Sequence, residues 1–573
     1  MDGKVDYSQW SSEKLLERVT YLEEDLRRQN ARYELLAQKR RTPSPLPQPK
    51  RSRSIRQIDP SKYSTRLIAL KFAYLGQRYN GLEYHANNNT RFPTIEEEMW
   101  KALDKAKLIF PTPNPALKEG EPNWEGCEYS KSGRTDKGVS AFGQVIGIRV
   151  RSNRPLEKEA MEAGAINGKE VFEQDGSDPK SDDETSPSNQ AAFDPIKDEI
   201  PYPQILNRLL PPEIRVLAWC PSPPPDFSAR FSCGERCYKY FFTQPAFTPT
   251  VGQEGLLPIS RGDDGRQREG WLDIEAMREA AEKFEGSHDF RNFCKVDPSK
   301  QIDNFRRVIN RSEIVEVHSR DQKRKMGYLD LPQFQQRYPP PPLSSAQDGP
   351  NTNSHANEST TPTSQQPPKI YAFKVRGSGF LWHQVRHMVA ILFLVGQGLE
   401  QPSLITDLLN TAKHLERPTY DMADPSPLVL EECNFPGAGL QWIHLGDYTG
   451  HEAGVRKAGA KGNGKYGLSG TVGELWRVWH RHKIDETLAA SLLDIAAGDR
   501  DVGVGVGDGG NGEQPSGNSV RNTESQKVYQ GGDAPRLVGK YIPILQRPRM
   551  ETVDAINAKY LKRKGLDPPD RNR

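Results

Sequence analysis

Residues 131–144 of this 573-residue chain read KSGRTDKGVSAFGQ, and the sequence continues as VIGIRV over Val145–Val150. The second stretch is short and rich in β-branched residues, which predicts a buried strand. The first is a polar loop in which Asp136 stands between two cations, Arg134 and Lys137. A carboxylate at the mouth of a strand, beside an arginine, suits catalysis, but an aspartate followed by Lys-Gly is also typical of an ordinary turn. The loop alone leaves both interpretations open.

Composition limits how much of the chain can fold. Only 35% of the residues are hydrophobic, and the 46 prolines and 48 glycines are clustered, which predicts a core of moderate size with disordered insertions and tails. Insertions are expected at about 153–200, which is acidic, and about 319–369, which is rich in Pro, Ser, Thr, Gln and Asn. The net charge of +3 conceals this segregation, since residues 39–56 are strongly basic. Such asymmetry predicts a polyanionic partner for the basic parts and acidic stretches that stay in solvent.

Cysteine spacing and hydropathy exclude several classes of protein. The six cysteines are widely spaced, without a CxxC pair or an accompanying His pair at metal spacing, so we expect a reduced protein without a zinc site. The longest apolar run, Met388–Val395, is too short to cross a bilayer, and no signal peptide is recognisable. We therefore expect a soluble intracellular protein.

Residues 13–36 have helical character because apolar residues recur at spacings of four, three and four: Leu15, Val19, Leu22 and Leu26. A short coiled coil or an RNA-contacting helix would use this stripe. A solvated amphipathic helix would show it as well, and a pattern of fewer than three heptads favours that interpretation. The Pro-rich basic arm that follows, KRRTPSPLPQPKRSRSIR, is typical both of a nuclear-localisation signal and of a nucleic-acid-binding arm.

The remaining apolar patterns predict strands interspersed with helices. Strands are expected at 68–74, 145–150, 214–217, 236–242, 305–317 and 370–375,. Helices are expected after a capping box at Thr94 and Glu97, over 273–285 with Asp273 as its cap, over 380–395 and over 475–493,.

Two of these segments contain charged residues that are unusual in a hydrophobic core. Residues 236–242, RCYKYFF, combine basic and aromatic side chains, as is needed to bind phosphate and to stack bases. An edge strand with a Tyr/Phe core face would have the same composition. The helix over 380–395 is apolar on nearly all sides and yet contains Arg386. A buried arginine is costly unless a carboxylate meets it, and the alternative is a side chain that reaches the helix surface.

Six stretches resemble, in the same order, those of the TruA-type tRNA pseudouridine synthases. They are LKFAYLGQRYNGLEYH, SGRTDKGVSA, LNRLLPPEIRVL, DFSARFSCGERCYKYFF, AAEKFEGSHDFRNFCK and GSGFLWHQVRHMVAILFLVG, within about residues 62–447. The run RPTYDMADPSPLVLEECNF, residues 417–435, is similar to the eukaryotic branch that acts on uridines 38 and 39 of the anticodon arm. The alternatives are a broad-specificity synthase of this type that acts on other tRNA uridines and a non-catalytic tRNA-binding protein on the same scaffold.

The resemblance implies an α+β fold with two related subdomains, 62–225 and 226–447. Their sheets would join into one mixed, mainly antiparallel sheet, flanked by helices, along a basic cleft. Residues 1–61 would form a helical segment and a basic arm, and 448–573 a mixed extension with Gly-rich disorder and a basic tail. The resemblance further implies a homodimer that binds tRNA, without a metal or other cofactor and without a membrane, in the nucleus, the cytoplasm or both.

The resemblance also assigns roles to individual residues. Asp136 resembles the family's nucleophile, and Arg386 resembles the arginine that pairs with it. Arg134 resembles the arginine that flips and holds the target nucleotide, and Tyr238 the tyrosine that stacks on the target base. Tyr240, further along the same strand, is expected to be a core residue. Three further basic residues are expected to bind the substrate: Arg78, Lys137 and Arg236.

The reaction implied by this assignment is an isomerisation. Asp136, kept ionised by Arg386, would start cleavage of the N1–C1′ bond, either by nucleophilic attack or by assisting proton loss at C2′. The freed uracil would rotate and rejoin through C5. Tyr238 is the candidate for removing the C5 proton, by analogy with the family. The sequence leaves the choice between the two routes open.

Overall fold

The computed structural model describes residues 11–41, 59–86, 90–118, 120–156, 193–249, 256–258, 266–317, 368–445, 465, 470–497 and 526–566. Most of the two predicted insertions, most of the basic arm and the Gly-rich tract lie outside these ranges. The chain divides into two compact units, Met1–Pro60 and Ser61–Arg573. In the first unit the predicted helix is present as α1 (Ser12–Arg41). The apolar stripe of α1 is exposed at Val19, Leu22 and Leu26.

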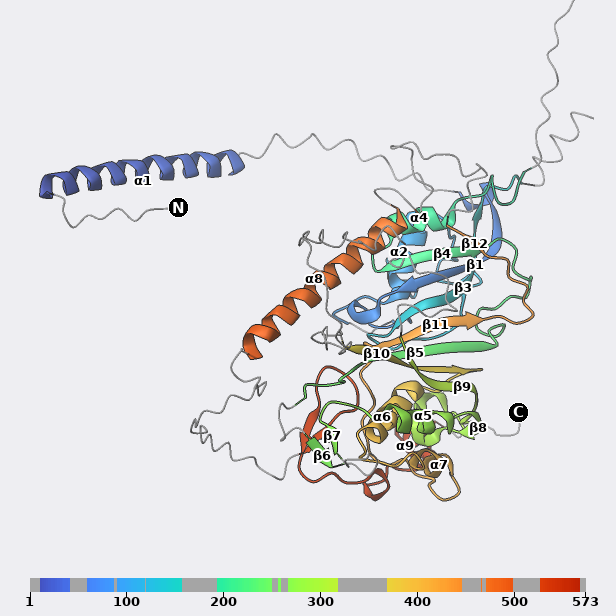
Figure 1. Cartoon of the computed structure of the whole chain (residues 1–573). Coiled ribbons are helices and arrows are strands. Elements are labelled where there is room, and N and C mark those ends of the chain that lie inside the picture. The colour runs from blue at the N-terminus through green and yellow to red at the C-terminus, as the bar shows by residue number, and fades with distance from the viewer. Residues whose placement is uncertain are drawn as a thin grey trace, which may run out of the picture. The chain divides into compact units, whose positions relative to one another are not determined.

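The second unit is organised around one ten-stranded sheet (Figure 1). Its strands follow the order β12-β4-β1-β3-β11-β5-β10-β9-β8, and β2 pairs with β3 off this path. The β3–β11 pair is parallel and the other pairs of this sheet are antiparallel. The predicted α+β fold with a mixed, mainly antiparallel sheet is thus confirmed. The strands are β1 (Ser64–Tyr74), β2 (Ser130–Lys131), β3 (Ser140–Ser152), β4 (Ile214–Cys220), β5 (Glu235–Gln244), β8 (Gly286–Asp289), β9 (Arg306–Glu316), β10 (Lys369–Gly377), β11 (Leu428–Asn434) and β12 (Ile443–His444).

The early and late parts of the chain meet at β3 and β11. Val429 of β11 lies opposite Ser140 of β3. The backbones approach closely at Gly143, where a Cβ atom would lie 2.6 Å from the carbonyl oxygen of Glu431, so only glycine fits there. The division predicted near residue 225 falls between β4 and β5, whereas the sheet itself runs on across it, and β12 returns to pair with β4.

Alternation along β1 sends its side chains to two cores. Ile68, Leu70, Phe72 and Tyr74 belong to the main core, as their predicted strand pattern requires. Ala69 belongs to a smaller cluster that also contains Val145 and Phe227.

Helices flank the sheet in Figure 1, with α4 against β4 and α5 against β9. They are α2 (Ile95–Lys105), α4 (Tyr202–Leu209), α5 (Ile274–Glu282), α6 (Gln384–Gly396), α7 (Leu404–Leu409), α8 (Thr471–Ala497) and α9 (Val553–Lys564), and the small strand pairs are β6 (Leu256–Pro258) with β7 (Arg266–Arg268) and β13 (Gln526–Val528) with β14 (Arg536–Val538). Two predicted caps are present, because the side chain of Thr94 accepts a hydrogen bond from the Glu97 amide and that of Asp273 from the Ala276 amide. None of the described helices is long and apolar enough to cross a membrane.

Helix α6 differs in one respect from the helix predicted over 380–395. It begins at Gln384 rather than at 380, because His383 adopts a left-handed conformation with φ of 61° that a helix cannot continue through,. All residues of α6 are buried, so the predicted buried helix is confirmed.

The C-terminal extension packs into the second unit. Val528, Tyr529 and Ile544 are buried. The side-chain amide of Gln397 donates to the carbonyl of Tyr529 and accepts from its amide, and the Tyr541 hydroxyl donates to Glu400 at 2.6 Å. These contacts join residues that are far apart in the chain and irregularly spaced, so no periodic sequence pattern predicted them.

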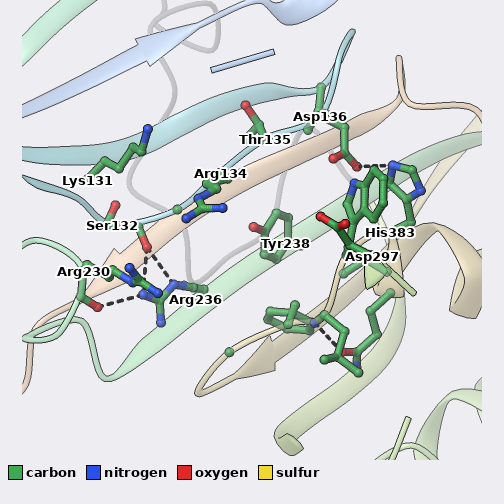
Figure 2. Close-up of a pocket in the computed structure, with 18 of the residues that line it drawn as sticks. Lys131, Ser132, Arg134, Thr135, Asp136, Arg230, Arg236, Tyr238, Asp297 and His383 are labelled. Atoms are coloured by element: carbon green, nitrogen blue, oxygen red, sulfur yellow. Dashed lines mark hydrogen bonds and ion pairs between the residues drawn. The ribbon is translucent and has the colours of Figure 1, made fainter. Parts of the chain in front are cut away.

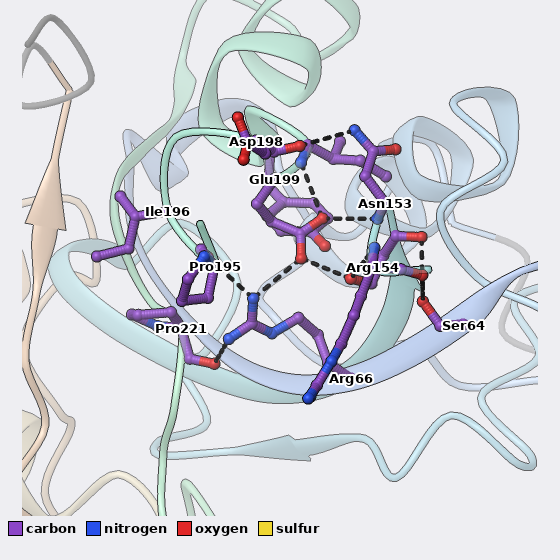
Figure 3. A network of polar contacts seen from close by, with 12 residues as sticks. Ser64, Arg66, Asn153, Arg154, Pro195, Ile196, Asp198, Glu199 and Pro221 are labelled. Carbon is purple, nitrogen blue, oxygen red and sulfur yellow. Dashed lines mark hydrogen bonds and ion pairs between the residues drawn. The ribbon is translucent and has the colours of Figure 1, made fainter. Parts of the chain in front are cut away.

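One acid of the predicted acidic insertion is also buried (Figure 3). The side chain of Glu199 is 0% exposed and accepts hydrogen bonds from Ser152 Oγ at 2.6 Å, Asn153 N at 2.9 Å and Arg66 Nη1 at 2.9 Å. Burial raises the pKa of Glu199, but these donors outweigh it and hold the pKa below its ordinary value. The expectation that the acidic stretches stay in solvent is wrong at this position, because Glu199 joins the start of β1 to the end of β3.

We predict that Glu199→Ala lowers the free energy of unfolding by about 3 kcal/mol, because Arg66 loses its carboxylate in a buried site. The depressed pKa means that this contribution is present above the unfolded-state pKa of a glutamate and is lost as the pH falls through the folded-state pKa. Urea titrations of both proteins at neutral and at acidic pH measure this. Glu275→Ala, which removes an exposed carboxylate on α5, is the matched control and should cost less than about 1 kcal/mol. Equal losses in the two variants, or a difference that persists at low pH, would contradict the prediction.

Candidate active site

The loop that carries Asp136 is shorter than the sequence suggested. The predicted polar loop over 131–144 begins in β2 and already belongs to β3 from Ser140 onward. The loop proper therefore spans only the residues between these two paired strands. Both ends of the loop are fixed by the sheet, which limits how far Asp136 can move.

A buried polar network attaches this loop to the sheet. Gln144 is 0% exposed, and its Oε1 accepts from Ser132 Oγ at 2.6 Å and from the Gly133 amide at 3.1 Å. Its Nε2 donates to the Gly133 carbonyl at 2.9 Å. Gln144 Nε2 also donates to the Tyr74 hydroxyl at 3.5 Å, and this hydroxyl lies 2.7 Å from Thr135 Oγ1. Because each of these buried groups has a partner, the network holds the loop in one conformation.

The loop after β1, residues 76–81, packs directly on the Asp136 loop. At Gly76 a Cβ atom would lie 2.0 Å from the carbonyl oxygen of Val139. Gly81 has a φ of +86°, and a Cβ atom there would lie 2.8 Å from the carbonyl oxygen of Thr135. Larger residues would push the two loops apart, so both glycines are required for the close approach.

The carboxylate of Asp136 faces the residues at the start of α6 (Figure 2). Its Oδ2 lies 3.4 Å from Nε2 of His383 and 4.0 Å from Nη1 of Arg386. The Asp136 side chain is 27% exposed, whereas those of His383 and Arg386 are 9% and 10% exposed. The Arg386 Nε donates to the carbonyl of Ala423 at 2.7 Å. The structure thus brings together the acid and the buried arginine that the sequence required to have a partner.

Burial decides the protonation of this cluster. Burial raises the pKa of Asp136 above its ordinary value, although Arg386, a hydrogen bond from Trp382 and Lys295 each oppose that rise. Burial also lowers the pKa of His383 to about 4, and the positive charge of Arg386 adds to the effect. His383 is therefore neutral at pH 7, so its contact with Asp136 is between an imidazole and a carboxylate and is not an ion pair. The cation that faces the carboxylate is Arg386.

Asp136 lines a pocket of about 890 Å³. Basic residues outnumber acids in its wall, since eight Lys or Arg and three Asp or Glu line it: Lys131, Arg134, Arg230, Arg236, Lys295, Lys300, Arg307, Arg386, Glu96, Asp136 and Asp297. Aromatic residues stand among them: Tyr84, Trp124, Tyr129, Phe231, Tyr238, Phe305, Phe380 and Trp382. A pocket of this kind suits a ligand that combines negative charge with flat rings. The described residues contain no group of three or more His, Cys, Asp or Glu that could hold a metal ion.

Of the predicted site residues, Tyr238 and Arg134 also line this pocket. Tyr238 is 8% exposed, and its ring meets Phe380 edge to face at 5.1 Å. Burial raises the pKa of the Tyr238 phenol well above its ordinary value. Tyr240 is 1% exposed, which confirms it as a core residue. Arg134 is 46% exposed, and its Nε lies 3.3 Å from Glu83, so its guanidinium remains accessible from the pocket.

Of the other predicted basic residues, Arg236 also lines the pocket, but its guanidinium is committed to backbone carbonyls. Arg236 donates to the backbone carbonyls of Ser132, Cys233, Ser378 and Arg230. These hydrogen bonds occupy the Arg236 guanidinium in joining β5 to the Asp136 loop, which favours a structural role for this residue. Arg78 and Lys137 are exposed and do not line the pocket.

The sequence interpretation missed four residues around Asp136 and along the rim of the pocket. Trp382, His383 and Lys295 act on Asp136 or on each other, and Phe231 is 80% exposed with the Arg230 guanidinium 5.1 Å from its ring. The only sequence signal was that these residues lie in the quoted stretches GSGFLWHQVRHMVAILFLVG, AAEKFEGSHDFRNFCK and DFSARFSCGERCYKYFF. Their convergence depends on pairing between strands that are far apart in the chain.

Comparison with known proteins gives this geometry a context. The family model described as "tRNA pseudouridine synthase" matches residues 280–436. The chain is 32% identical over 562 residues to the tRNA pseudouridine(38/39) synthase of Saccharomyces cerevisiae, covering 97% of this chain and 92% of that protein. It is 30% identical to the human protein of the same name, covering 97% and 89%. It is also 26% identical to the tRNA pseudouridine synthase A of Methanothrix thermoacetophila, covering 65% and 85%.

The similarity to the yeast protein extends over nearly the whole of both chains. The chain therefore belongs to the tRNA pseudouridine synthase family of the TruA type.

Proposed function

We propose that this protein is an enzyme that converts uridine to pseudouridine in tRNA. The observation that carries the proposal is the placement of Asp136, whose carboxylate faces Arg386 in the same pocket that Tyr238 lines. Pure RNA binding requires a basic surface, but it does not require a carboxylate held against a buried guanidinium within that surface. The alternative of a non-catalytic tRNA-binding protein leaves this arrangement unexplained.

The pocket suits a nucleotide that has left its base stack. Enzymes that act on a base extrude it into a pocket, at a cost of a few kcal/mol that is smallest for loop nucleotides. We assign the stacking of the target base to Tyr238, which is worth about 1–3 kcal/mol per base. Arg134 stands at the accessible side of the pocket and is the candidate for holding the flipped nucleotide. The basic lining supplies attraction for the phosphates.

The chemistry is an isomerisation in which one glycosidic bond replaces another. Asp136 initiates cleavage of the N1–C1′ bond, either by attacking C1′ or by accepting a proton from C2′. The uracil rotates, a C5–C1′ bond forms, and the proton on C5 is lost while one is gained at N1. Arg386 stabilises the ionised form of Asp136, and neutral His383 and Trp382 fix the position of the carboxylate. Tyr238 is the proposed base for C5, although burial raises its pKa, so it would act only with a coupled proton transfer.

The names of the relatives suggest which uridines are modified. The yeast and human relatives are tRNA pseudouridine(38/39) synthases, and we propose the same two positions of the anticodon arm for this protein. A broader specificity for tRNA uridines is the second candidate. We further propose a homodimer with two related subdomains along a basic cleft, and a location in the nucleus, the cytoplasm or both.

We predict that Asp136→Asn abolishes pseudouridine formation in unmodified tRNA while tRNA binding is retained. The amide keeps the size of the side chain but cannot act as a nucleophile or a base. Mapping of pseudouridine in the product tRNA checks both the rate and the position. Asp104→Asn, which changes an exposed aspartate on α2, should leave activity unchanged. Full activity in the Asp136→Asn protein would overturn the mechanism, and modification that spares positions 38 and 39 would overturn the assigned specificity.

A second prediction concerns pH. Activity requires ionised Asp136, so kcat/KM should fall as the pH drops through a pKa above the ordinary value of an aspartate. In Arg386→Met the charge that lowers this pKa is absent, so the acidic limb should move to higher pH, with a rate loss of roughly 100-fold near neutrality. Thermal stability should also fall, because Asp136 loses its buried partner.

The pH profile of the Arg386→Met enzyme separates this role from a general loss of folding. A merely structural residue would lower the rate at every pH without moving the limb. The control is Arg311→Met, which removes an exposed arginine of β9 that pairs with Glu285 and Glu313. This variant should leave the pH profile in place. An unmoved limb in Arg386→Met would show that Arg386 does not set the charge of Asp136.

A further inference from the structure

A second cavity of about 360 Å³ adjoins the active-site pocket. Lys295, Val296 and His383 line both of them, so these residues form the wall between the two spaces. The rest of the second cavity is built by Arg291 and Cys294, the start of α6, the segment over 415–422 and the C-terminal segment over 550–556. Its most prominent polar group is Arg417, which begins the run RPTYDMADPSP that the proposed chemistry does not use.

The guanidinium of Arg417 makes contacts that are poor for a cation. Its Nη1 lies 3.2 and 3.1 Å from the two ring nitrogens of His387. Its Nη2 donates to the sulfur of Met550 at 2.8 Å, and its central carbon stands 5.5 Å from the ring centre of Tyr420. Burial, and then the charge of Arg417, lower the pKa of His387, so this imidazole is neutral. A guanidinium offers five donors and a thioether is a weak acceptor, which leaves Arg417 without an anionic contact in the described structure.

The carboxylates that line the cavity are committed elsewhere. Asp421 pairs with Arg536, and Glu551 pairs with Lys559. A third basic residue of the lining, Arg291, is already held by Asp289, outside the lining, at 2.7 Å. Lys295, the cation in the shared wall, stacks its ammonium over Trp382 at 4.6 Å, and no ion pair to a described carboxylate accompanies that contact. The cavity therefore presents Arg417 as a cation without a carboxylate partner among the described residues. Lys295 is a second cation in its wall, and its charge also acts on Asp136.

The position of Arg417 is fixed by the backbone. The amide of Met550 donates to the Arg417 carbonyl at 2.8 Å, and the amide of Thr419 donates to the Pro548 carbonyl at 3.0 Å. Next to this pairing, Val553 and Ile556 from the first turns of α9 close the cavity. The C-terminal segment thus fixes the backbone at Arg417, and Met550 of that segment also contacts the guanidinium.

We propose that this cavity binds a phosphate group of the tRNA backbone, next to the nucleotide held in the active-site pocket. Arg417 would supply a bidentate fork to the phosphate oxygens and Lys295 a second positive charge through the shared wall. The inference rests on the proposed function, because the shared wall makes the neighbouring phosphate of a bound RNA strand the anion nearest to the cavity. A free phosphate ion has the same chemistry and is the source that the experiment must distinguish.

The test measures RNA binding rather than turnover, so that it remains informative if the proposed reaction fails. The substrates are a series of full-length unmodified tRNAs, each with one uncharged methylphosphonate at a different position of the anticodon arm. The affinity of each tRNA is measured for wild type, Arg417→Gln and Arg417→Lys at several salt concentrations. In wild type one position should lose about tenfold in affinity, the size expected for a lost charge-assisted hydrogen bond. Arg417→Gln should lose about as much on ordinary tRNA and nothing further at that position. Its slope of log affinity against log salt should be shallower by about 0.7–0.9.

Controls separate the possible outcomes. Arg311→Gln removes a cation that already has two carboxylate partners and should bind like wild type, and thermal melting checks that each variant is folded. Arg417→Lys should keep the salt slope but lose the bidentate contact, and it serves as the test if Arg417→Gln does not fold. The proposal is overturned if no methylphosphonate position couples to Arg417. It is equally overturned if inorganic phosphate alone raises the melting temperature through Arg417 while RNA affinity does not depend on it.

Discussion

The candidate site is built around a carboxylate, Asp136, that faces a guanidinium, Arg386, where burial disfavours both charges. Burial raises the pKa of Asp136 and makes the cation of Arg386 costly, and each reduces the cost of the other at a separation of 4.0 Å. Such a pair is useful only if its geometry is fixed. Gln144 fixes the loop on one side, and the left-handed turn at His383 fixes the start of α6 on the other.

Helix α6 has a second role because its side chains point in different directions. Arg386 reaches the active-site pocket, while His387, the next residue, faces the second cavity and contacts Arg417. His383, one turn earlier than His387, lines both spaces. One buried helix therefore supplies residues to both spaces. An RNA strand that filled both spaces would contact the residues that line both of them, among them His383 and Lys295.

Local sequence patterns predicted the features that depend on local physics. Alternation located β1, the caps at Thr94 and Asp273 located two helices, and a charge in an apolar helix required that Arg386 have a partner. The features that the sequence did not predict depend on contacts between residues that are far apart in the chain. Glu199 looks like part of a solvated acidic stretch until Arg66 is placed beside it. The C-terminal segment is held by its buried side chains and by contacts to Gln397 and Glu400, and none of these follows a periodic pattern.

The parallel join of β3 to β11 also has a consequence for biosynthesis. Ser132, in the Asp136 loop, contacts Cys433 of β11 at 3.2 Å across 301 residues of sequence. At about 5–20 residues per second, a ribosome needs roughly 15–60 s to make that length of chain. Until β11 is made, the edge of β3 lacks this partner strand, and an unpaired strand edge is prone to aggregation. The parallel pairing of β3 with β11 therefore cannot form until the chain has been translated past Asn434, where β11 ends.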